Sequence, residues 1–109
     1  MDSRNDRQLI QKILDEYTRI PYSHGDIKCV PIYDTQHDRY LLMAVGWDDR
    51  RIHGCIVHVD LIDGKFWIQR DGTEEGIATD LLAAGVPKQR IVLAFYPVKD
   101  RPLTGFAVA

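Results

Sequence analysis

The sequence IHGCIVHVDLIDGKFWIQRD, residues 52–71, is the most informative part of the chain about its fold. Most of its residues are β-branched, aliphatic or aromatic, and Asp63-Gly64 near its centre is a dipeptide typical of a two-residue β-turn. We therefore predict a β-hairpin whose strands are residues 52–62 and 65–70. A two-residue loop would place Ile62 opposite Lys65, Asp60 opposite Trp67, His58 opposite Gln69 and Ile56 opposite Asp71.

This register gives the hairpin two different faces, because side chains alternate sides along a strand. The apolar face should lie on the core and consists of Cys55, Val57, Val59, Leu61, Phe66 and Ile68. The opposite face, termed the mixed face, consists of Ile56, His58, Asp60, Trp67, Gln69 and Asp71. A large aromatic residue among polar groups is typical of protein interfaces, although the first helix or the C-terminal segment would also cover such a tryptophan. The candidate partner-binding residues are His58, Asp60, Trp67, Gln69 and Asp71, with the neighbouring Thr73 and Glu74.

Two further strands are predicted before the hairpin. Residues 40–47 are apolar at nearly every position, which is typical of a central strand with something packed on each side. Residues 27–33 are also apolar, but Pro31 cannot donate a hydrogen bond within a sheet, so we expect this strand at an edge or a bulge. The charged residues 48–51 should form the turn that leads into residue 52.

Two helices flank these strands. One is an amphipathic N-terminal helix that should end before Pro21, with its apolar stripe formed by Leu9, Ile10, Ile13, Leu14 and Tyr17. A second helix should follow the hairpin, with Asp71 or Thr73 able to cap it. Its expected buried stripe is Ile77, Ala78, Leu81 and Leu82. With another strand at residues 91–95, the fold class is α+β, with a mostly antiparallel sheet of four to five strands.

Composition favours one cytoplasmic domain over residues 1–109. A chain of 109 residues can bury one core, and 14 basic against 16 acidic residues give a net charge of −2. This charge does not favour tight, nonspecific binding to nucleic acid. No apolar run resembles a signal peptide or a membrane span, and the two cysteines are expected to be reduced thiols.

The nearest approach to a catalytic pattern is Asp60 followed by Gln69-x-Asp71 across the hairpin. Metal-dependent nucleases place an aspartate on one strand and Glu-x-Lys on the next, and here Gln69 replaces the carboxylate and Asp71 the lysine. A degenerate metal-dependent nuclease that uses Asp60 and Asp71 is therefore one alternative. We expect no enzyme activity, metal or cofactor, because the ligand set and the general base are both incomplete.

A second alternative is direct DNA binding by a dimer. Its possible contacts are Arg50, Arg51 and Lys65, which lie in two predicted hairpin turns. Solvated charged turns are the simpler interpretation of these residues.

Long stretches of the chain resemble the XisI family, the fdxN element excision controlling factors of cyanobacteria. The resemblance rests on Val45-Gly46-Trp47, on Arg51-Ile52-His53-Gly54-Cys55, on the run WIQRDGTE at residues 67–74 and on the C-terminal residues 104–109. It implies a role in programmed DNA rearrangement during heterocyst differentiation, beside a separate site-specific recombinase and an XisH-like partner. It implies no catalytic residue. We therefore expect a non-catalytic controlling factor that binds an XisH-like protein through the mixed face, with a homo-oligomer as a further possibility.

Overall fold

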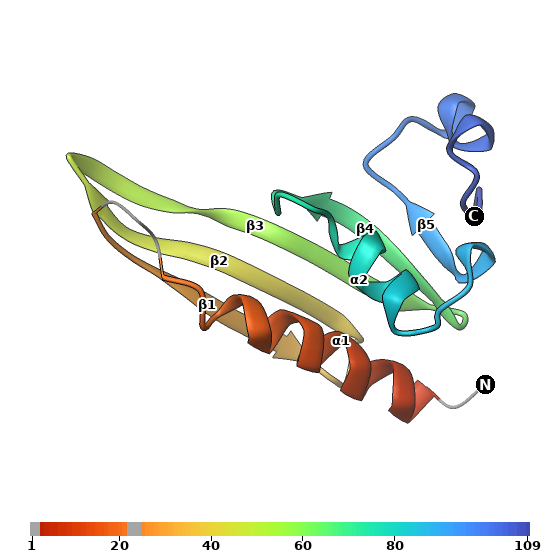
Figure 1. Ribbon diagram of the computed structural model, residues 1–109, viewed down its shortest axis with the longest axis horizontal. Coiled ribbons are helices and arrows are strands. Elements are labelled where there is room, and N and C mark those ends of the chain that lie inside the picture. The colour runs from red at the N-terminus through yellow and green to blue at the C-terminus, as the bar shows by residue number, and fades with distance from the viewer. Residues whose placement is uncertain (1–2, 22–24) are drawn as a thin grey trace.

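Helices pack against a five-stranded sheet in the computed structural model, which describes residues 3–21 and 25–109 (Figure 1). The helices are α1 (Ser3–Tyr17), α2 (Ile77–Ala83), and the short 3-10 helices η1 (Lys88–Arg90) and η2 (Val98–Thr104). The strands are β1 (Asp26–Asp34), β2 (Arg39–Asp48), β3 (Arg50–Ile62), β4 (Lys65–Asp71) and β5 (Ile91–Leu93). They lie in the order β1-β2-β3-β4-β5, with β5 parallel to β4 and the other neighbouring pairs antiparallel. The predicted α+β class, with a helix before the strands and another after the central hairpin, is confirmed.

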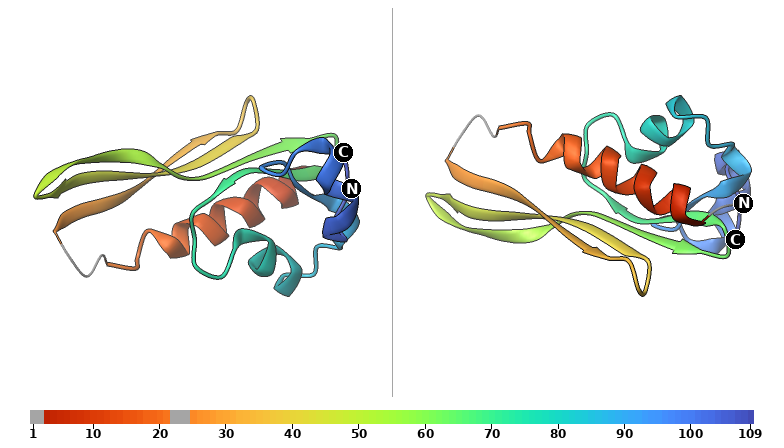
Figure 2. Two further views of the ribbon diagram at one scale, coloured as in Figure 1. Left: turned by 90° about the horizontal axis from the view of Figure 1, so that it is seen from above. Right: turned by 90° about the horizontal axis from the view of Figure 1, so that it is seen from below.

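Both α-helices lie on one side of the sheet, which is termed the helix side (Figure 2). The expected stripe of α1 is buried there through Ile10, Ile13 and Leu14, while Leu82 of α2, which was expected to be buried, is 36% exposed. The core residues opposite the helices are Tyr40, Leu42, Val57, Val59, Phe66 and Ile68. These residues come from β2, β3 and β4, so the three central strands supply most of the sheet's share of the core.

The other side of the sheet, termed the outer face, carries no α-helix (Figure 2). Along β2, Leu42 and Ala44 are buried on the helix side, whereas Leu41 and Met43 are only partly buried and Trp47 is 59% exposed. The prediction that something packs on each side of β2 is therefore wrong for the described residues. The apolar character of residues 40–47 comes from two faces with different surroundings.

Strand β1 forms one edge of the sheet, as Pro31 predicted. The end of the β2–β3 hairpin, beside the start of β1, projects beyond the end of α1 and forms an arm (Figure 1). The backbones of β1 and β2 approach closely in the arm. A Cβ added at Gly46 would lie 1.9 Å from the backbone oxygen of Asp26. Glycine is therefore required at position 46.

A largely buried ion pair ties α1 to the second half of the chain. The Arg90 guanidinium donates to Asp6 Oδ2 at 2.6 Å, and both side chains are close to nine-tenths buried. Arg90 Nε also donates to the backbone oxygen of Gly64 in the β3–β4 turn, at 2.9 Å. Arg90 thereby joins α1, the central hairpin and the entry to β5.

The C-terminal segment docks beside β5. The backbone N–H of Ala107 donates to the oxygen of Ile91 at 2.9 Å, and Ala107 forms an isolated parallel bridge with Val92. Lys65 Nζ donates to the backbone oxygen of Ala109 at 2.5 Å. Among the described helices, none is long and apolar enough to cross a membrane.

Candidate functional site

The register of the central hairpin agrees with the prediction near the turn and departs from it further along. Ile62 pairs with Lys65 and Asp60 with Trp67, as expected. Beyond them the register shifts between His58 and Val59, so that His58 pairs with Arg70 and Val57 with Asp71. Strand β4 has gained one residue at this bulge. Because a shift of one residue reverses the side of every later side chain, Asp71 lies with Val57 on the helix side.

Asp71 builds the start of α2. Its Oδ2 accepts the backbone N–H of Ile77 at 2.7 Å, and its Oδ1 accepts the N–H of Thr73 at 3.0 Å and the Thr73 hydroxyl at 2.5 Å. Thr73 Oγ1 in turn accepts the N–H of Gly76 at 3.1 Å. The expectation that Asp71 or Thr73 is the N-cap residue is wrong, because Gly76 holds that position and makes no side-chain cap hydrogen bond. Asp71 nevertheless accepts the first N–H of α2, and Thr73 accepts the N–H of Gly76. Asp71 and Thr73 thus hold the β4–α2 connection.

A second bulge moves Ile56 and Cys55. The β2–β3 register shifts between Leu42 and Met43, so that Leu42 pairs with Val57 and Met43 with Cys55. Ile56 therefore packs against the core, although it was expected on the mixed face. Cys55, which was expected on the core, pairs instead with the outer residue Met43. Desolvation raises the pKa of the Cys55 thiol above its usual range.

The mixed face is consequently divided between the two sides of the sheet. His58, Asp60, Trp67 and Gln69 stay together on the outer face, whereas Asp71, Thr73 and Glu74 belong to the helix side. The prediction of one continuous face is wrong, because it assumed a ladder without bulges. The four outer residues and the three helix-side residues therefore belong to different surfaces.

The four outer residues form a connected polar and aromatic group. Asp60 Oδ1 lies 2.8 Å from His58 Nε2, and Gln69 Nε2 donates to Asp60 Oδ2 at 3.4 Å. The guanidinium of Arg101 lies 5.7 Å from the centre of the Trp67 ring, a cation–π distance. Trp67 is therefore partly covered by η2 of the C-terminal segment, which was one of the two possibilities for this residue.

An apolar strip continues from this group across the outer face. Its members are Val30 and Ile32 of β1, Leu41, Met43, Val45 and Trp47 of β2, and Cys55 of β3. Ile32 is 51% exposed and Trp47 is 59% exposed, and Arg51 lies over the Trp47 ring at 5.4 Å. Contiguous exposed apolar surface of this kind is typical of interaction sites.

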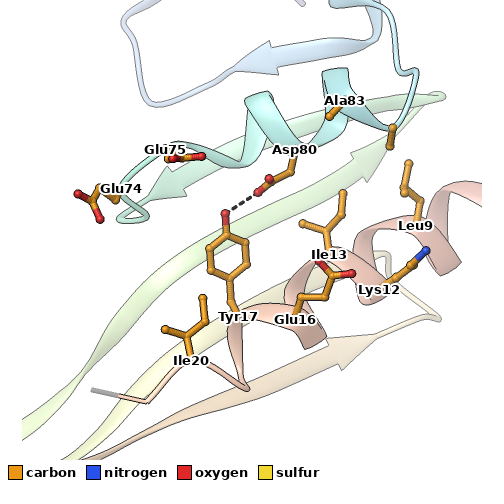
Figure 3. A pocket seen from close by; sticks show the side chains of 11 residues that line it. Leu9, Lys12, Ile13, Glu16, Tyr17, Ile20, Glu74, Glu75, Asp80 and Ala83 are labelled. Carbon is orange, nitrogen blue, oxygen red and sulfur yellow. Dashed lines mark hydrogen bonds between the residues drawn. The ribbon is translucent and has the colours of Figure 1, made fainter. Parts of the chain in front are cut away.

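A groove that the sequence did not reveal lies on the helix side, between α1 and the segment that leads into α2 (Figure 3). The Tyr17 hydroxyl reaches across it and donates to Asp80 Oδ2 at 2.5 Å. Burial, reinforced by this hydrogen bond, raises the pKa of Tyr17 to about 12. Glu74 lines the same groove. The lining residues are far apart in the sequence, so no local pattern marked them.

Comparisons with known proteins decide the family. The family model described as XisI protein matches residues 1–108. The chain belongs to the XisI family. A XisI-like protein from Anabaena variabilis ATCC 29413 has a crystal structure with a TM-score of 0.90 and 34% identity, covering 99% of this chain and 100% of that chain. The fdxN element excision controlling factor XisI from the same organism gives a TM-score of 0.80 and 35% identity, covering 94% of this chain and 95% of that chain. A search of curated proteins finds no match.

The nuclease alternative lacks its geometry in this XisI-family fold. Asp60 faces the outer side, where it contacts His58 and Gln69, and Asp71 faces the helix side, where it accepts the first N–H of α2. The two carboxylates therefore cannot share one metal ion. Within residues 3–21 and 25–109, no group of three or more His, Cys, Asp or Glu residues could hold a metal.

The three basic residues suggested for DNA contact do not form one patch. Arg50 and Arg51 begin β3 at the tip of the arm, whereas Lys65 follows its other end. The 13 residues of β3 span about 40 Å at the usual rise for a strand. Lys65 is also engaged with the C-terminal segment through Ala109. Contact of Arg50 and Arg51 with DNA stays a prediction.

Proposed function

We propose that this XisI-family protein is a non-catalytic controlling factor for excision of a DNA element, and that it acts by binding an XisH-like protein. One of the solved structures that it resembles over nearly its whole length is named the fdxN element excision controlling factor XisI. The proposed action takes place in the cytoplasm, beside a site-specific recombinase, during heterocyst differentiation. With a net charge of −2, the chain would leave the main DNA contacts to its partners.

The observation that carries the proposal is the open apolar strip on the outer face. Within the described residues no helix covers this strip. Leu41, Met43 and Val45 are therefore only partly buried, and Ile32 is half exposed. A protein partner would remove this apolar surface from water, which favours association by about 25 cal/mol per Å² before the costs of ordering are subtracted.

The polar group beside the strip would fix the orientation of a bound partner. His58 and Asp60 are hydrogen-bonded to each other, so together they offer a partner a fixed arrangement of donors and acceptors. Trp67, covered on one side by Arg101, adds a large aromatic surface at the end of the strip nearest to β5. An apolar centre beside hydrogen-bonding groups is the usual anatomy of a protein interface.

The experiment is co-expression with an XisH-like protein, followed by size-exclusion chromatography with light scattering. The wild-type pair should elute as one mixed complex. Ile32→Glu should weaken the complex at least about tenfold, because it puts a charge into the apolar strip. Ile32 is an informative position because it lies on the edge strand and is 51% exposed, so the fold should tolerate the change.

Leu103→Glu is the matched control, since Leu103 is 86% exposed on η2, outside the strip. It should leave the complex intact. Separate elution of the two wild-type proteins would refute the proposal that an XisH-like protein is the partner. An intact complex with Ile32→Glu and with Leu41→Glu would show that the partner binds elsewhere.

A further inference from the structure

The helix side of the sheet carries a continuous groove. Two adjoining hollows of about 590 Å³ and 330 Å³ share Tyr17, Ile20 and Glu74 in their linings. The larger runs between α1 and α2, and the smaller continues over the sheet at Leu42 and Ile56. Figure 3 shows the side chains of α1 facing those of the β4–α2 connection and α2 across the larger hollow. These two hollows together are termed the helix groove.

The floor of the helix groove is apolar. On the α1 side it presents Leu9, Ile13, Tyr17 and the 60% exposed Ile20. Facing them are Ala83 and Ala84, whose small side chains leave the larger hollow open. From Leu9 to Tyr17 the helix rises about 12 Å, which gives a segment of two to three helical turns a length of apolar surface to lie along.

The rim of the helix groove is acidic. Glu16 stands on α1, with Glu74 and Glu75 opposite on the β4–α2 connection (Figure 3). All three are exposed, and none of them forms an ion pair with any residue that the structure describes. Among the residues that the structure describes, Lys12 is the one basic residue in the lining of the larger hollow. The negative charge at the rim is therefore not neutralised across the groove.

We infer that the helix groove binds a basic amphipathic helix of a partner protein, with apolar residues on the floor and Lys or Arg at the rim. An amphipathic helix lying in an apolar groove is a common recognition mode. Charge complementarity selects the occupant, because the glutamates attract basic side chains and repel both acidic segments and the phosphates of nucleic acid. Tyr17 and Asp80, joined by their hydrogen bond, offer the backbone or side chains of the segment further polar contacts.

This surface is separate from the outer face, since the sheet lies between them (Figure 2). The inference therefore goes beyond binding of an XisH-like protein through the outer face. A chain with two surfaces on opposite sides of one sheet can hold two protein elements at the same time. This arrangement suits a factor that brings proteins together.

The test uses nuclear magnetic resonance on the full isotope-labelled chain. The first probe is a synthetic peptide of about four helical turns, with Leu on one face and Lys on the other. The second probe is the same peptide with Glu in place of every Lys. The Lys peptide should bind with a Kd of about 100 μM or tighter. It should shift amide signals within residues 9–20 and 73–84, and the Glu peptide should not bind.

The charge requirement is tested with Glu74→Lys combined with Glu75→Lys, which should weaken binding of the Lys peptide at least about tenfold. Asp26→Lys combined with Asp48→Lys makes the same change in net charge on the exposed arm, and it should change the Kd less than about twofold. No binding of the Lys peptide, equal binding of both peptides, or shifts centred on the outer face would each overturn the inference. The amide signals of the wild-type protein that shift on addition of the Lys peptide locate the binding site even if a variant fails to fold. Ile32→Glu should leave peptide binding unchanged, so failure of the outer-face proposal and failure of this one are distinguishable.

Discussion

Replacement of Asp71 by alanine should lower the stability of the protein far more than replacement of an exposed aspartate on a hairpin. The Asp71 carboxylate accepts three hydrogen bonds, from the backbone N–H groups of Thr73 and Ile77 and from the Thr73 hydroxyl. The residue directly before α2 is Gly76, which has no side chain to cap the helix. Asp71 is therefore the side chain that satisfies the first N–H of α2.

The magnitude follows from these contacts. Loss of a helix cap costs about 1 kcal/mol, and a hydrogen bond to a charged group contributes about 1.5 to 3 kcal/mol. Since the three bonds share one carboxylate and are not additive, we expect Asp71→Ala to lower the free energy of unfolding by about 2 to 3 kcal/mol. For a domain of this length, that loss lowers Tm by about 10 °C. Asp71→Asn, which keeps one acceptor oxygen, should lose about half as much.

The assay is urea denaturation followed by circular dichroism, with the slope m compared between variants. Asp60→Ala is the control, because Asp60 lies on the outer face and, among the residues described, its carboxylate is hydrogen-bonded only to the side chains of His58 and Gln69. Asp60 is largely buried, but its carboxylate accepts no backbone N–H within residues 3–21 and 25–109, so the loss should be only about 1 kcal/mol. An equal loss for Asp60→Ala and Asp71→Ala would refute the assignment of Asp71 to the helix side.

Three further predictions concern the arm, alkaline pH and the buried ion pair. Gly46→Ala should cost about 2 kcal/mol or more in urea denaturation, because its Cβ would meet backbone at 1.9 Å. Gly54→Ala, which meets nothing within 4 Å, should change stability by less than about 0.5 kcal/mol, and similar losses would contradict this. Burial raises the pKa of both Tyr17 and Tyr40 to about 12. The resulting stability is therefore fully present below about pH 10 and lost as the pH rises toward 12, and tyrosinate absorbance that rises at the ordinary pKa in the folded protein would contradict it. Arg90→Met leaves its largely buried carboxylate partner unpaired and should cost about 3 kcal/mol, and a loss below about 1 kcal/mol would show that the pair is not important.

Local sequence patterns were sufficient to predict most of the elements of this protein. Asp63-Gly64 marked the central turn, and Pro31 marked an edge strand, since these residues act through the backbone of their immediate neighbours. Alternation of apolar residues predicted that Val57, Val59 and Phe66 face the core, and all three are fully buried. The unusual run at residues 67–74 also carried the resemblance to the XisI family, which the family model confirms.

The candidate site was only partly predictable, because it depends on how the strands align. His58, Asp60 and Trp67 lie close to the Asp63-Gly64 turn, where the predicted register holds for Asp60 and Trp67. Asp71 lies beyond the bulge, so its side chain points to the other side of the sheet. One inserted residue changes the assignment of every later position, and a bulge leaves no clear mark in the apolar pattern.

The α+β class, the hairpin, the stripe of α1 and the family could be inferred from the sequence, since each depends on neighbouring residues or on a continuous motif. Which surfaces are open depends on how the elements pack together. The outer face is exposed because both α-helices pack on one side, and the helix groove exists because residues near position 17 meet residues near position 80. The Asp6–Arg90 pair likewise joins positions 84 residues apart. Contacts between such distant residues arise from the packing of whole elements, and local periodicity carries no information about that packing.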